Sequence, residues 1–131
     1  MKIDTLFIDQ QVEDSQETGY LISKLQQEPV IVESAKPVFD HVVSSSDPIA
    51  KGKKTLYITH NKGAVVRDCP GTTEYTCCDY TILHTGTYCS MDCAYCILQS
   101  YFHPPVLQYF ADFDRIKTAL ETVFSHHKIY R

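Results

Sequence analysis

Residues 85–102 read TGTYCSMDCAYCILQSYF and contain three cysteines, Cys89, Cys93 and Cys96. Three residues separate the first pair, two separate the second, and all three thiols fall within one short loop. Such a loop can wrap one face of a metal centre. A cubic [4Fe-4S] cluster usually takes four cysteines, one on each iron. A loop that provides three leaves one iron open to an external ligand, which a reactive cluster needs.

Zinc is the alternative metal for this loop. Zinc prefers four tetrahedral ligands and usually shows paired CxxC or CxxH units, whereas this loop has one CxxC. A fourth ligand would have to come from outside the loop, from Cys77, Cys78, His84 or His103. The spacing and the aromatic neighbours favour an iron–sulfur cluster over zinc. Three buried structural thiols would give no reason for this spacing.

The placement of all six cysteines also points to a metal. They lie between positions 69 and 96, with Cys69, Cys77 and Cys78 preceding the loop, and the first half of the chain has none. Disulfides that staple a small fold would be spread along it. The amino terminus, MKIDTLFIDQ, places two aspartates within its apolar stretch, so it is not a signal peptide. We therefore expect a soluble, cytoplasmic protein with reduced thiols and no membrane span.

Composition sets further limits on the class of protein. The chain has 131 residues, of which 44% are hydrophobic and 21% charged, as in an ordinary globular domain. The net charge of -4 argues against a small basic nucleic-acid-binding module. It does not exclude a nucleic-acid substrate that binds in a local basic groove. Lys51, Lys53 and Lys54 form the one basic cluster, and a solvated loop is favoured there over a phosphate contact.

Residues 1–66 are predicted to form a small α/β unit. Apolar runs at 3–8, 29–34 and 55–59 predict strands, and residues 15–27 have helical spacing weakened by Gly19. The polar stretch 41–54 is predicted to be a loop. This order resembles a parallel Rossmann-like layer. No GxGxxG follows the first strand, so no dinucleotide site is expected.

Residues 67–131 have a different composition, rich in Cys, Tyr, Thr and Gly. Residues 67–78 are turn-rich, 79–86 predict a strand, and 97–102 predict a short helix that Pro104 and Pro105 end. Residues 112–125 give the best helix, capped by Asp112 or Asp114, with an apolar face of Phe113, Ile116, Leu120, Val123 and Phe124.

The C-x-x-x-C-x-x-C spacing is the signature of radical S-adenosylmethionine (radical SAM) proteins. The wider run CPGTTEYTCCDYTILHTGTYCSMDCAYCILQSYF resembles the spore photoproduct lyase family of these proteins. The closest part is CSMDCAYCILQSYF, including Tyr95 before the third cysteine and Leu98-Gln99 after it. KKTLYITHNKGAVVRDCP and the preceding α/β unit are also similar to that family's pre-barrel region. The resemblance covers nearly the whole chain.

The resemblance implies a specific site and activity. Cys89, Cys93 and Cys96 would bind a [4Fe-4S] cluster, and the open iron would chelate S-adenosylmethionine, with Tyr95 beside its adenine. Reductive cleavage, fed by a partner such as a flavodoxin or ferredoxin, would give methionine and a 5'-deoxyadenosyl radical. The family's namesake lyase activity reverts a thymine photodimer in DNA, which is DNA repair. The implied fold for 67–131 is the first β/α unit of a truncated, partial (β/α) radical SAM barrel.

Two departures from the family pattern modify these expectations. The chain stops where the family continues into its second barrel strand and glycine-rich segment, so we expect an N-terminal portion that is inactive alone. Cys77 and Cys78 precede the cluster and do not match the family's hydrogen-donating cysteine, and the roles of Cys69, Cys77 and Cys78 are open. The alternatives are a small zinc- or cluster-binding interaction module without catalysis, and an inert remnant of a damaged gene.

Overall fold

The computed structural model describes residues 2–71, 74 and 80–125. The chain divides into two compact units. The first contains Met1–His60 and Gly86–Ala111, and the second contains Asn61–Thr85 and Asp112–Arg131. Cys77 and Cys78 lie outside the described residues.

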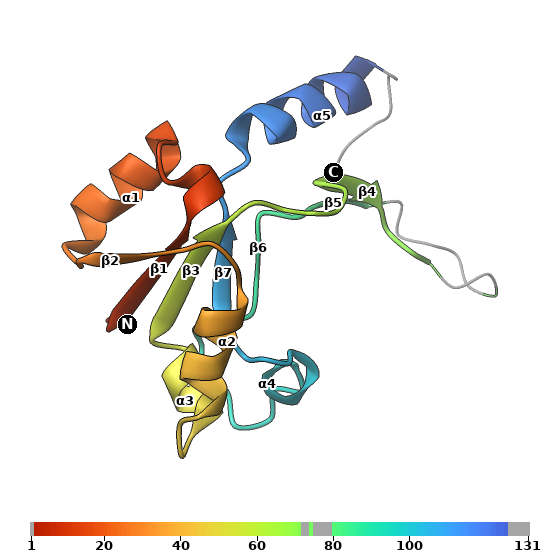
Figure 1. Cartoon of the computed structure of the whole chain (residues 1–131). Coiled ribbons are helices and arrows are strands. Elements are labelled where there is room, and N and C mark those ends of the chain that lie inside the picture. Colours follow the sequence, from red (N-terminus) through yellow and green to blue (C-terminus); the bar gives the residue numbers. More distant parts are fainter. Residues whose placement is uncertain (1, 72–73, 75–79, 126–131) are drawn as a thin grey trace. The chain divides into compact units, whose positions relative to one another are not determined.

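The first unit is built on a mostly parallel five-stranded sheet (Figure 1). Its strand order is β2-β1-β3-β7-β6, in which the first four strands are parallel and β6 is antiparallel to β7. The strands are β1 (Thr5–Asp9), β2 (Pro29–Val32), β3 (Thr55–Thr59), β6 (Gly86–Thr87) and β7 (Leu107–Phe110). The predicted α/β class is confirmed, as is its parallel layer of strands. One sheet includes strands from both sides of the predicted boundary at residues 66 and 67.

Both faces of this sheet carry a buried apolar cluster, because side chains alternate between faces along each strand. Leu6, Ile8 and Ile58 pack on one face with residues of α1 (Gln16–Leu25). Phe7 and Tyr57 point to the other face and pack with Val38 and Val42 of α2 (Lys36–Val43). The sheet is therefore the middle layer between helices, and its near-continuous apolar strands fit that position.

The remaining helices of this unit are short. They are η1 (Gln10–Val12), α3 (Pro48–Gly52) and α4 (Leu98–Tyr101). Helix α4 confirms the helix predicted at 97–102, and α1 forms despite Gly19. Ser15 caps α1 by accepting a hydrogen bond from the backbone N–H of Thr18 at 3.1 Å, which satisfies an otherwise unpaired donor.

The predicted loop at 41–54 is wrong in part, because α2 extends to Val43 and α3 fills Pro48–Gly52. Pro48 begins a helix here, at a position where its missing N–H costs no hydrogen bond. Asp47 caps that helix by accepting from Ala50 N at 3.0 Å. The prediction of a solvated loop also fails for Lys53, which is buried.

Two further differences concern the region around the cysteine loop. Strand β7 was not predicted, although Val106–Phe110 is a short apolar run that follows two prolines. The single strand predicted at 79–86 is two short strands in different sheets, β5 (Thr81–Leu83) and β6. Residue 79 lies outside the described residues.

The second unit contains a two-stranded antiparallel sheet and one helix. Strand β4 (Val66–Asp68) pairs with β5, and α5 (Phe113–Ser125) confirms the helix predicted at 112–125. No described residue of α5 is buried. Ile116, Leu120 and Val123 are half-buried, while Phe113 and Phe124 are exposed, so the apolar face is only partly covered. No helix in the described ranges is long and apolar enough to cross a membrane.

Candidate metal centre

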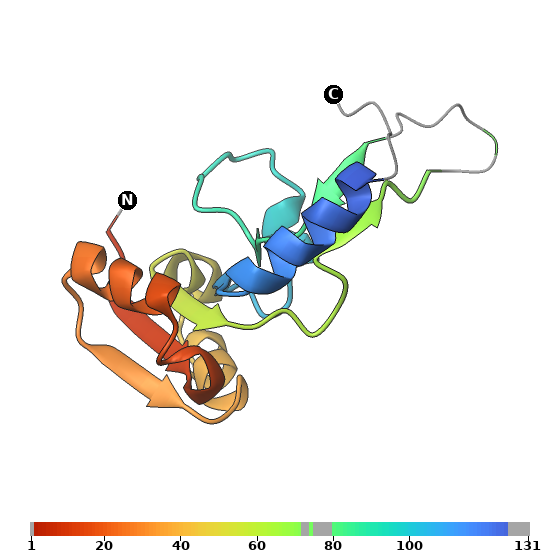
Figure 2. The same ribbon diagram turned by 90° about the horizontal axis from the view of Figure 1, so that it is seen from above.

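The three cysteines of the C-x-x-x-C-x-x-C spacing lie on one loop between β6 and α4, within the first unit. This cysteine loop, residues 88–97, is teal in Figure 2 and leaves the sheet at its β6 edge. Cys89, Cys93 and Cys96 are half-buried and form no disulfide. The side chains at 90–92, 94 and 95 are exposed. Within residues 89–97, the cysteines are therefore the less exposed residues.

Short-range hydrogen bonds shape the loop around these thiols. The Cys89 sulfur accepts from Met91 N at 3.4 Å, a contact that suits a thiolate ligand. Cys96 N donates to Cys93 O at 3.1 Å, which closes a turn over the CxxC segment. The Gln99 side chain donates from Nε2 to the same carbonyl at 2.7 Å. Cys93 is thus held through its backbone, independently of its sulfur.

The donor set can be compared with the two metals considered from the sequence. No group of three or more His, Cys, Asp or Glu side chains in the described part of the chain is arranged to hold a single metal ion. A cubic cluster makes a different demand, because each thiolate binds a different iron and the three sulfurs need not converge on one point. Three half-exposed thiols on one loop therefore fit a [4Fe-4S] cluster in their chemistry.

Sequence reasoning did not find the ion pair that joins this loop to the helical layer. Lys53 Nζ, at the end of α3, donates to Asp92 Oδ1 at 2.5 Å. The hydrogen bond to the Asp92 carboxylate raises the pKa of Lys53 above its ordinary value, although burial acts in the opposite direction. Lys53 therefore stays an ammonium ion beside the cysteine loop.

Two glycines allow close backbone contacts at the two ends of the segment that carries the cysteine loop. A Cβ on Gly86 would lie 2.4 Å from the Gln108 carbonyl oxygen, so β6 can pair with β7 only as glycine. A Cβ on Gly52 would lie 1.5 Å from the Pro105 carbonyl oxygen. These contacts fix the two ends of the segment that carries the cysteines.

Tyr88 leads directly into the first cysteine in an unusual conformation. Its φ is 69°, in the left-handed region that few non-glycine residues adopt and that often marks a functional segment. Its ring packs edge-on against Phe102 with centroids 6.1 Å apart, which links the start of the loop to the end of α4. Burial raises the pKa of the Tyr88 hydroxyl.

Tyr95, predicted to lie beside a cofactor's adenine, is 92% exposed. Met91 and Ile97 of the loop are also exposed, as is Tyr101 of α4, so apolar and aromatic side chains are presented near the thiols. The predicted role of Tyr95 stays a prediction. Cys69 lies in the second unit, where its N–H donates to Tyr80 O at 2.8 Å.

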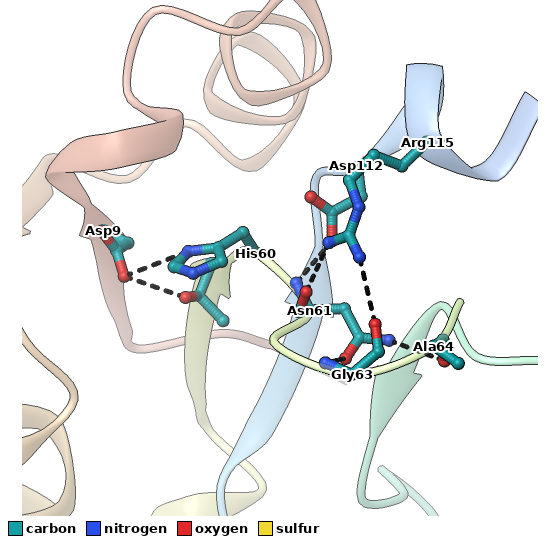
Figure 3. A network of polar contacts seen from close by, with 8 residues as sticks. Asp9, His60, Asn61, Gly63, Ala64, Asp112 and Arg115 are labelled. Atoms are coloured by element: carbon teal, nitrogen blue, oxygen red, sulfur yellow. Dashed lines mark hydrogen bonds and ion pairs between the residues drawn. The ribbon is translucent and has the colours of Figure 1, made fainter. Parts of the chain in front are cut away.

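A second polar cluster lies at the carboxyl ends of β1 and β3 (Figure 3). The buried Asp9 carboxylate accepts from Tyr57 Oη and Thr59 Oγ1, both at 3.0 Å, and from Gln11 N at 3.0 Å. His60 Nδ1 lies 3.9 Å away. Burial alone would raise the pKa of Asp9, but these donors and His60 together hold it below its ordinary value. The carboxylate thus joins the central strands of the sheet.

Asp9→Asn is expected to lower the free energy of unfolding at neutral pH by about 1–3 kcal/mol, because it replaces a buried, hydrogen-bonded carboxylate. A carboxyl with a lowered pKa stabilises the fold above its unfolded pKa, and this contribution disappears as pH falls through its folded pKa. Urea denaturation against pH should therefore show less loss of stability in acid for the variant. The control is Asp14→Asn, at an exposed carboxyl. Equal pH curves for Asp9→Asn and the unaltered chain would contradict this account.

In the second unit a polar network fixes the turn that precedes β4 (Figure 3). The Asp112 carboxylate accepts from Asn61 N, and Arg115 donates to the carbonyl oxygens of Asn61 and Gly63 at 2.5 and 3.1 Å. Asn61 Oδ1 accepts from Gly63 N at 2.8 Å. The start of α5 therefore determines how the chain enters the hairpin.

Comparison with known proteins gives the fold a close parallel among solved structures. A spore photoproduct lyase double mutant with bound AdoMet and dinucleoside spore photoproduct matches with a TM-score of 0.72 at 14% identity. The match covers 95% of this chain. The fold is similar to that of part of spore photoproduct lyase. The lyase complexed with dinucleoside spore photoproduct gives the same values, and a tyrosine-to-phenylalanine mutant gives a TM-score of 0.71, also at 14% identity.

The chain spans 36% of the length of these spore photoproduct lyase structures. The resemblance predicted from the cysteine loop and its flanks is confirmed at the level of the fold. No family model and no curated protein matches the sequence. The likeness to spore photoproduct lyase therefore rests on the arrangement of the backbone together with the spacing of the cysteines.

Proposed function

We propose that this chain forms the cluster-binding part of a radical SAM enzyme similar to spore photoproduct lyase. One observation carries the proposal: three unpaired, half-buried thiols with the C-x-x-x-C-x-x-C spacing share one loop in a chain with that lyase's fold. Within this proposal, residues 1–66 are the α/β unit that precedes the barrel and residues 67–131 begin the partial barrel. The two parts share one sheet, because β7 and β6 continue it beside β3.

Cys89, Cys93 and Cys96 are the proposed ligands of a [4Fe-4S] cluster. When bound, the reduced cluster would give one electron to S-adenosylmethionine, which splits into methionine and a 5'-deoxyadenosyl radical. The chain's own residues hold the loop for this purpose. The Cys93–Cys96 turn presents the last two thiols, and Tyr95 offers an exposed ring on which an adenine can stack.

The proposed substrate is based on what the solved spore photoproduct lyase structures contain. One solved spore photoproduct lyase holds AdoMet and a dinucleoside spore photoproduct. We propose a photodamaged thymine pair in DNA as the substrate of the complete enzyme. A flavodoxin or ferredoxin is the proposed reductant. The cytoplasm is the proposed location, since reduced thiols persist there.

The exposed apolar side chains of the cysteine loop favour a second candidate, a metal-binding interaction module without catalysis. Met91, Tyr95 and Ile97 of the loop, and Leu98 and Tyr101 of the adjoining α4, are exposed apolar side chains of the kind that partners cover. Such a module would accept zinc or a cluster as a structural element. It would need no iron open to an external ligand.

Mild oxidation of the reconstituted, anaerobic chain separates these two candidates. An iron held by no cysteine is the most easily lost, so iron should fall from about four to about three per chain. Iron analysis, together with the spectrum of the remaining cluster, measures the change. Full retention of iron would show that the protein ligates every iron, which would remove the open site that the proposed reaction needs.

A further inference from the structure

Lys53 is a buried cation whose charge is matched from the cysteine loop. Its side chain is 9% exposed, and lysine is seldom so buried without a partner. Among the described residues its partner is Asp92, which lies between Cys89 and Cys93 in the sequence and 39 positions away from Lys53. The ion pair therefore reaches into the middle of the proposed ligand set.

The two partners are exposed very differently. The Asp92 side chain is 89% exposed, so Lys53 is the buried member of the pair, and the exposed loop residue contacts it. Gly52, the neighbour of Lys53, is buried against Pro105 at the other end of the segment between β6 and β7. The carboxyl end of α3 thus contacts this segment at two points. In the described part of the chain, the other hydrogen bonds of residues 89–96 stay within 89–99.

The Lys53–Asp92 pair also lies at the edge of a pocket. The volume of this pocket is about 650 Å³, and Ser90 and Gln99 also line it, so the loop forms one wall of a cavity.

We propose that Lys53 is a positioning residue that tethers the cysteine loop through Asp92 and holds its thiols ready for a cluster. The consequence for a cluster rests on the proposed function, whereas the tether itself belongs to the metal-free chain. Lys53 touches neither cofactor nor substrate in this account. It acts through the position of the loop.

Asp92→Asn is the most informative variant, because its exposed side chain can change without disturbing the packed core. Alkylation of each thiol in the metal-free chain, followed by mass spectrometry, should show Cys89, Cys93 and Cys96 reacting about threefold faster or more. Asp92→Glu keeps the charge and should restore the original rates. Cys69, in the second unit, is an internal control whose rate should not change.

Asp4→Asn is the matched control, since Asp4 pairs with the neighbouring Lys54 at 4.0 Å and both side chains are largely exposed. It should leave all three loop thiols at their original rates. Lys53→Met and the double variant Lys53→Met/Asp92→Asn complete the test. If the two residues act as one tether, the double variant should react about as fast as Asp92→Asn alone.

Two outcomes would overturn the tether. Loop thiols that react at the original rate in Asp92→Asn would show that the pair does not hold the loop. Acceleration of Cys69 together with the loop would show a general loss of stability instead. These readouts are independent of iron. A chain that never binds a cluster would refute the proposed function, but the alkylation rates would still test the tether. Faster loss of the cluster to a chelator in Asp92→Asn would support both the proposed function and the tether.

Discussion

Cys93→Ala is expected to reduce the iron bound after anaerobic reconstitution from about four per chain to near zero. The reason is that a site with three thiolates has no spare ligand. Cys93 is also well suited to alanine, because its carbonyl accepts hydrogen bonds from Cys96 N and the Gln99 side chain, and the substitution keeps both. The variant should therefore lose a ligand without losing the turn. Iron and sulfide analysis measures the effect.

Cys69→Ala is the control for this substitution, since Cys69 lies in the second unit and outside the cysteine loop. It should keep its full iron content. Iron that survives in Cys93→Ala would remove Cys93 from the ligand set. Loss of iron from Cys69→Ala would add Cys69, which lies outside the cysteine loop, to the ligand set.

Gly52→Ala is expected to lower the free energy of unfolding by about 3 kcal/mol, which is large for the addition of one methyl group. The added Cβ would lie 1.5 Å from the Pro105 carbonyl oxygen and 2.7 Å from its carbon. Both are backbone atoms and cannot rotate away as a side chain would. Helix α3 and the segment leading into β7 must therefore separate. Urea denaturation followed by circular dichroism measures the loss.

Gly19→Ala provides a matched control in α1. Its Cβ would meet nothing within 4 Å, and the position is exposed. Alanine is the better helix former, so this variant should gain up to about 1 kcal/mol of stability. A Gly52→Ala chain as stable as the unaltered one would contradict the packing of α3 against Pro105.

Local patterns in the sequence predict much of the fold. The strand at 55–59 and the helix at 112–125 have unambiguous apolar periodicity, and both form as predicted. Prediction is weaker where a residue is compatible with two kinds of local structure. Pro48 in a polar stretch indicates a loop, yet with Asp47 before it the same proline begins a helix.

For the candidate site too, the local features could be predicted from the sequence and the long-range contacts could not. The spacing of Cys89, Cys93 and Cys96 is local, so the sequence alone indicates a metal-binding loop. What positions the loop is not local. Lys53 has the sequence context of a solvated lysine, yet it is buried, and the carboxylate that its ammonium contacts lies 39 positions away. The requirement for glycine at position 86 likewise depends on the backbone of a strand that forms later in the chain.

The most direct test of the central claim is the iron, sulfide and zinc content of the purified chain after anaerobic reconstitution. We expect about four irons and about four sulfides per chain, held by the cysteine loop. Zinc bound tightly without sulfide would contradict it. That result would refute a radical SAM site and leave a metal-stabilised interaction module whose fold is similar to part of spore photoproduct lyase.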